Sequence, residues 1–204
     1  MREHPLVEFI YSEFGKPLGD LLLVGYGSAH AGRKESFEFN APRGGRDVRR
    51  WAVDVTACEL PRGNEPLVLA ALLKFLLFRV DHDDEMYLSD SFEFNMQNLL
   101  REVGRDGRTR MSPEEAHQAI EKYVRLSYTL REVEPGADLA QARSRTMGLR
   151  TFLSSHTYYL ERENHVVEPV RLIDRVRIDK EFAEGLKGGK LLFAGMELGE
   201  RVPA

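Results

Sequence analysis

The chain has 204 residues, 42% of them hydrophobic and 30% charged, which suffices to bury a core in one larger domain or in one domain with an appendage. The single cysteine, Cys58, excludes an intramolecular disulfide framework and a cysteine-rich zinc site, and its apolar, strand-like surroundings favour a buried structural thiol. The formal net charge of -4 excludes a protein that coats nucleic acid with its whole surface, but it permits a local basic patch.

The N-terminus, "MREHPLVEFI", mixes charged with apolar residues and lacks the uninterrupted apolar core of a signal peptide, so a cytoplasmic protein is expected. Residues 1–60 are predicted to form an N-terminal β-element. Strand-like runs are found at residues 19–27, "GDLLLVGYG", and at residues 49–61, "RRWAVDVTACELP". The connection between them has room for a short strand at residues 36–40, "SFEFN".

A core helix is predicted from Asn64 to about Arg79, because Asn64 can cap it and Pro66 falls in its first turn. Its apolar run is broken by Lys74 and is shorter than the roughly 20 residues that cross a bilayer, so no membrane partner is expected. An acidic loop follows at residues 81–90. A two-residue strand-like lead-in then precedes a short helix from about Asn95 to Val103, which Gly104 stops.

The next helix, predicted over residues 112–131, has the strongest start signal in the chain. Ser112 is a good N-cap, Pro113 suits the first turn, and Glu115 completes a capping box. An apolar stripe for packing on the core is formed by Ala116, Ile120, Tyr123, Ser127 and Leu130. The opposite face carries side chains that read base edges or hold phosphates, namely Gln118, Lys122, Arg125 and Thr129.

Arginines bracket this helix on both sides, which favours a local basic patch. The candidate DNA-binding residues are Arg105, Arg108, Arg110, Gln118, Lys122, Arg125, Thr129, Arg143, Arg145 and Arg150. Ordinary solvated surface residues have the same composition, so the pattern leaves both interpretations open.

After this helix the signals become β. Residues 149–163 read as a strand, residues 163–165 as a turn and residues 166–179 as a second strand, with a last short helix at residues 179–188. This order predicts an α+β fold, a winged helix-turn-helix with an N-terminal β-element and a C-terminal β-hairpin as its wing. Residues 61–190 would form the DNA-binding domain, and residues 191–204 a tail or the start of a second domain.

We find no catalytic motif in the sequence. It has no His-x-His pair for a metal-dependent nickase, and "GLKGGKLL" lacks the glycine spacing of a phosphate loop. Ser28 lacks the Gly-x-Ser-x-Gly setting of a nucleophile elbow, and His117, His156 and His165 are scattered residues near the helix face and the hairpin. We therefore expect no enzyme, no cofactor and no metal site.

Several blocks together resemble the replication initiator proteins of bacterial plasmids: "WAVDVTACELPRGNEPLVLAALLKF", "FEFNMQNLLREVG", "AIEKYVRLSYTL" and "VRIDKEFAEGLKGG". Trp51, Leu60, Pro61 and the helix from Leu67 to Lys74 match the family pattern, and the resemblance runs from about Pro17 to Gly189. It implies a winged-helix domain that binds repeated double-stranded sequences at a replication origin. Family members typically continue into a second winged-helix domain.

The expected function is sequence-specific binding of double-stranded DNA in the initiation of plasmid replication. A homodimer and host replication proteins are further expected partners. Two alternatives stay open because a fold does not deliver a function by itself. One is a winged-helix interaction module that dimerises through the N-terminal β-element, and the other is a transcriptional repressor with the same binding chemistry.

Overall fold

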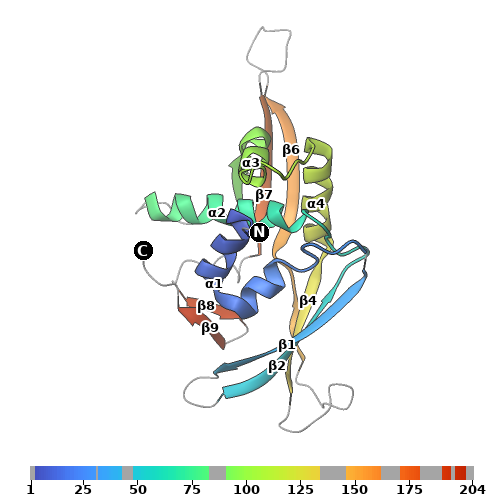
Figure 1. Ribbon diagram of the computed structural model, residues 1–204, viewed down its shortest axis with the longest axis vertical. Helices are drawn as coiled ribbons and strands as arrows, with labels where there is room; N and C mark the ends of the chain where they lie inside the picture. The colour runs from blue at the N-terminus through green and yellow to red at the C-terminus, as the bar shows by residue number, and fades with distance from the viewer. Residues whose placement is uncertain are drawn as a thin grey trace.

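The computed structural model describes residues 3–30, 32–42, 48–82, 91–133, 146–161, 171–179, 190–193 and 196–200. It combines helices with small antiparallel sheets, as the α+β prediction requires (Figure 1). The helices are α1 (Pro5–Leu22), α2 (Pro66–His82), α3 (Met96–Val103) and α4 (Pro113–Arg125). The strands are β1 (Lys34–Pro42), β2 (Val48–Thr56), β3 (Ser91–Phe94), β4 (Ser127–Val133), β5 (Thr146–Arg150), β6 (Leu153–Glu161), β7 (Arg171–Ile178), β8 (Lys190–Phe193) and β9 (Met196–Glu200).

Helix α1 corrects the prediction for the N-terminus, because residues 19–22 close this helix instead of forming a strand. Its buried residues recur at helical spacing and include Leu6, Ile10, Phe14 and Leu18. Gly15 interrupts the helix with a φ of 70°, a conformation that glycine adopts readily, so a glycine that looks like a helix breaker makes a kink instead.

The start of α1 is joined to α3 through one histidine. The Nδ1 atom of His4 accepts a hydrogen bond from the Leu6 N–H at 3.1 Å, which caps the helix. The Nε2 atom of His4 donates to the Val103 carbonyl at 2.9 Å, at the end of α3. This buried contact fixes α1 against the short helix that precedes α4.

One antiparallel sheet has the strand order β1-β2-β4-β5. The predicted strand at residues 36–40 lies within β1, and β2 covers the first part of the second predicted strand. In the register of β2 and β4, Val53 lies opposite Leu130 and Asp54 opposite Thr129. The last part of the predicted helix 112–131, residues 127–131, is therefore wrong, since residues 127–133 pair as a strand.

The end of α4 has a local cause. Leu126 adopts extended backbone angles, φ −79° and ψ 135°, and Tyr128 two residues later is buried. The Tyr128 ring stacks on Phe152 with 4.8 Å between ring centroids. The apolar residues after Leu126 continue the helical spacing by coincidence, while aromatic packing and pairing with β2 favour the strand.

A second antiparallel sheet has the order β3-β7-β6 and lies beside α3 and α4 (Figure 1). It confirms the predicted pair of strands near the C-terminus, with Tyr158 opposite Asp174, and it confirms β3 as the lead-in to α3. The predicted turn at residues 163–165 lies outside the described residues, as do most of the acidic loop and of the last predicted helix. Strands β8 and β9 pair with each other and contact α1 and β1 through β9, an arrangement not predicted for this segment.

Helix α2 forms the centre of the core, as predicted. Its residues from Leu67 to Leu73 are all at most 1% exposed, and it packs against α1, α3 and α4. Among the described residues, no helix combines the length and the apolar character needed to cross a membrane.

Candidate nucleic-acid interface

The loop between α3 and α4 is shaped by one carboxylate. Asp106 accepts hydrogen bonds from the N–H groups of Arg108 at 3.0 Å and Thr109 at 2.8 Å, and from the Thr109 hydroxyl at 2.9 Å. The bond from the Thr109 N–H is the main reason that the pKa of Asp106 lies below its ordinary value. The loop that carries Arg108 and Arg110 therefore has a defined turn structure.

Helix α4 begins with the predicted capping box. The Ser112 hydroxyl accepts from the Glu115 N–H at 3.2 Å, and the Glu115 carboxylate accepts from the Ser112 N–H at 2.7 Å. Its inner face is fully buried at Ala116, Ala119, Ile120 and Tyr123.

Tyr123 anchors this inner face to α1. Its hydroxyl donates to the Leu22 carbonyl at 3.2 Å, and burial raises the pKa of Tyr123 well above that of an ordinary tyrosine. The outer face exposes Gln118, Glu121 and Arg125 to solvent. The predicted inner face is therefore confirmed at Ala116, Ile120 and Tyr123, and the predicted outer face at Gln118 and Arg125.

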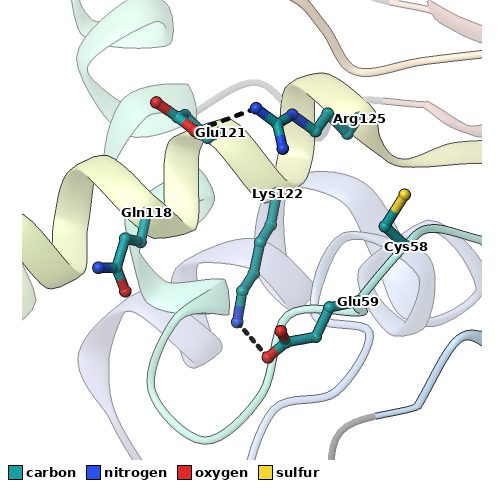
Figure 2. A pocket seen from close by; sticks show the side chains of 6 residues that line it. All are labelled: Cys58, Glu59, Gln118, Glu121, Lys122 and Arg125. Carbon is teal, nitrogen blue, oxygen red and sulfur yellow. Dashed lines mark hydrogen bonds and ion pairs between the residues drawn. The ribbon is translucent and has the colours of Figure 1, made fainter.

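Lys122 does not extend freely from α4 as the sequence predicts. Its side chain is only 17% exposed, and Nζ donates to Glu59 at 2.8 Å and to Glu65 at 2.8 and 2.9 Å. Figure 2 shows the contact with Glu59. Partial burial by itself would lower the pKa of Lys122, but the hydrogen bonds with both glutamates outweigh it and raise the pKa. Lys122 thus ties α4 to the segment between β2 and α2.

The predicted arginines differ in how free they are. Arg105 pairs with Glu102 at 3.2 Å, and Arg125 pairs with Glu121 on the outer face at 3.4 Å (Figure 2). Arg108 and Arg110 are exposed, and neither side chain forms an ion pair with the described part of the chain. Among the predicted arginines whose side chains the structure describes, these two are the most available to an anionic partner.

Two of the remaining candidates, Thr129 and Arg150, are on strands. Thr129 is on β4 opposite Asp54, so its placement on the helix is wrong. The backbone of Arg150 is on β5 opposite Tyr128, while Arg143 and Arg145 lie outside the described residues. The loop and α4 therefore bring together the candidates between Arg105 and Arg125.

A pocket of about 290 Å³ opens along the outer face of α4 (Figure 2). It is lined by Cys58, Glu59, Gln118, Glu121, Lys122 and Arg125. Cys58 is exposed there, contrary to the predicted buried thiol, because β2 ends at Thr56 and Cys58 belongs to the connection that follows. The lining includes two acidic and two basic side chains, so the pocket does not form a purely cationic site.

Sequence reasoning did not identify Glu59 and Glu65, which hold Lys122 in place. Lys122 is 63 residues from Glu59 and 57 residues from Glu65 along the chain. Patterns of local spacing contain no signal for such a contact. A lysine on a helix face next to exposed polar residues has the same appearance in the sequence whether it is paired or free.

No protein-family model matches the chain, and no curated protein matches it. A crystal structure of domains 2-3 of RctB is similar with a TM-score of 0.51 and 11% identity, covering 82% of this chain and 58% of that chain. A second, of selenomethionine derivatives of domains 2 and 3 of RctB, has a TM-score of 0.52 and 9% identity, covering 91% and 61%. This chain thus spans about three fifths of those structures. The likeness is one of fold, and RctB is a replication initiator.

Proposed function

We propose that the protein binds duplex DNA through α3, the 104–112 loop and α4, and that it acts in the initiation of replication, binding repeats at an origin such as that of a plasmid. The observation that carries the proposal is the exposed face of α4. This face stands on a helix pair that lies beside the β3-β7-β6 sheet, and this arrangement supports the winged-helix interpretation on which the proposal relies. The likeness to domains of a replication initiator supports it.

In this proposal α4 enters the major groove with its outer face. Gln118 makes a bidentate contact to an adenine edge, and Arg125 makes one to a guanine edge. Arg125 must first leave Glu121, but both partners of that pair are more than half exposed, at 69% and 57%, and such surface pairs contribute little stability. Breaking the Arg125–Glu121 ion pair to form a base contact should therefore cost little free energy.

The loop before α4 supplies the backbone contacts. Arg105, Arg108 and Arg110 are exposed and neutralise phosphates, which positions α4 but carries no sequence information. Glu114 and Glu115 in the first turn repel phosphate, so the base contacts begin in the second turn. Lys122 remains bound to its two glutamates and supports α4 instead of contacting DNA.

The sequence preference can be tested by selecting bound duplexes from a randomised pool and measuring affinities by fluorescence anisotropy at fixed salt. Gln118→Ala and Arg125→Ala should each cost about 1–3 kcal/mol of binding free energy and relax the preference at one base pair. Arg33→Ala, at an exposed position in the connection before β1 and outside the proposed interface, is the control and should keep both the affinity and the sequence preference. If both α4 variants retain full affinity and sequence preference, α4 supports the fold without contacting bases, and the protein-interaction alternative takes precedence.

Cys58 provides an independent test without any substitution, because the chain has a single cysteine and it lines the pocket beside α4 (Figure 2). A saturating amount of the selected duplex should slow the reaction of Cys58 with a maleimide reagent. The same concentration of a duplex that is not bound is the control. An unchanged reaction rate at saturation would place the DNA on another surface.

A further inference from the structure

Three side chains from separate elements converge between α4 and the β3-β7-β6 sheet. The Nε2 atoms of His117 on α4 and His156 on β6 both lie within hydrogen-bond distance of Asp174 Oδ1 on β7, at 2.8 and 3.0 Å. The two imidazole ring centroids are 5.4 Å apart. One potential metal-binding atom from each residue lies within 4.8 Å of the others.

The carboxylate in this cluster is fully buried. Asp174 is 0% exposed, and the side chains of His156 and His117 are 5% and 24% exposed. The second carboxylate oxygen, Oδ2, is buried and accepts no hydrogen bond from the described part of the chain. A buried carboxylate oxygen without a hydrogen-bond partner carries a desolvation cost, and a cation bound by the carboxylate would offset that cost.

We propose that His117, His156 and Asp174 bind a divalent transition metal ion of the Zn²⁺ type. Both imidazoles would coordinate through Nε2 and carry their proton on Nδ1, and Asp174 would coordinate through its carboxylate. Nitrogen donors suit this class of ion, whereas Ca²⁺ and Mg²⁺ prefer oxygen ligands. The fourth position is left for water on the side of His117, the most exposed of the three.

The present spacing is compatible with such a site. Zn–N and Zn–O bonds of about 2.0–2.1 Å place the donors of a tetrahedral site about 3.3 Å apart. The two nitrogen–oxygen separations, 2.8 and 3.0 Å, therefore need to widen by a few tenths of an ångström, while the donor nitrogens of the two histidines, which lie within 4.8 Å of each other, need to end about 3.3 Å apart. Rotations of the two histidine side chains would supply these changes.

The bound ion would join α4 to β6 and β7. It would thereby fix the orientation of α4 on the sheet, whatever partner the outer face of α4 contacts. The metal site does not depend on DNA binding, because its residues lie between α4 and the sheet while the proposed reading residues lie on the exposed face.

The test uses the full chain freed of metal by a chelator and then titrated with Zn²⁺ in a calorimeter, with Co²⁺ as a spectroscopic probe. We expect one ion per chain and visible absorption bands from tetrahedral Co²⁺. Free Zn²⁺ at 100 times its Kd should raise the Tm by about 5–10 °C. His117→Gln, at the most exposed of the three positions, should fold and lose the Tm shift and the Co²⁺ bands.

Asp174→Asn keeps the shape of the buried side chain and should also lose metal binding. His30→Gln is the control, because His30 is exposed in the connection before β1, and this variant should bind as the unmodified chain does. Absence of stoichiometric binding by the unmodified chain would overturn the proposal. Retention of binding by both His117→Gln and Asp174→Asn would also overturn it.

Discussion

Two substitutions on opposite faces of α4 should separate folding from recognition. Ile120 is 0% exposed, and Ile120→Ala removes three carbon atoms from the core. At about 0.8 kcal/mol for each buried carbon group, the transfer contribution is about 2.4 kcal/mol, and the cavity left behind brings the expected loss to about 2–5 kcal/mol. In a chain of this size the Tm should fall by about 4–20 °C.

Gln118→Ala removes an exposed side chain and should change the free energy of unfolding by no more than about 0.5 kcal/mol. Urea unfolding followed by circular dichroism measures both variants against the unmodified chain. A stability loss from Gln118→Ala that exceeds the loss from Ile120→Ala would refute the orientation of α4 on the core.

Gly25→Ala should lower the Tm strongly, because φ at this residue is +79° and the new Cβ would lie 1.8 Å from the Pro61 carbonyl oxygen. Gly27→Ala is the control, because Gly27 has a similar φ of +71° but no atom within 4 Å of the added Cβ. Equal losses of Tm in the two variants would contradict the steric clash at Gly25. Burial alone would raise the pKa of Glu102, but hydrogen bonds from Lys74 and Arg105 outweigh it and lower the pKa. Its contribution to stability is therefore present at neutral pH and lost as the pH falls through the folded pKa, below about pH 4.3. Glu102→Gln should flatten the decline in unfolding free energy on acidification, and an unchanged decline would show that these contacts stabilise nothing.

The sequence predicts the helices around the candidate interface well because their signals are local. Asn95 and Ser112 cap α3 and α4 within three residues of the groups they bind, and Gly104 ends α3 where expected. The paired strands β6 and β7 are predicted for the same reason, since their β-forming residues lie in continuous runs.

The errors occur where distant residues decide the outcome. Residues 127–133 continue the helical spacing of α4, but pairing with β2 makes them a strand. Helix α1 was not predicted, because the apolar run at residues 19–27 reads as a strand, and the packing of buried residues such as Leu6, Ile10 and Leu18 is what shows the helix. Local sequence patterns likewise give no indication of the partners of Lys122, because each partner lies more than 50 residues away along the chain.

The contact between His117, His156 and Asp174 could not be predicted from local sequence patterns either. His117 and Asp174 are 57 residues apart, and neither sits in a spacing typical of metal ligands. A lone aspartate in a strand of alternating character gives no indication that it will be buried. The sheet register and the packing of α4 on β6 are what place these side chains together.

The central claim is that the loop before α4 and the outer face of α4 contact duplex DNA. The salt dependence of binding tests it most directly, with the triple variant Arg105→Ala, Arg108→Ala and Arg110→Ala compared with the unmodified chain. The control removes the same charge from exposed positions elsewhere, at Lys16, Arg33 and Lys34. We predict that the loop triple weakens binding to all sequences and lowers the log–log salt slope by about 2–3, while the control changes neither. An unchanged affinity and slope in the loop triple would contradict the account.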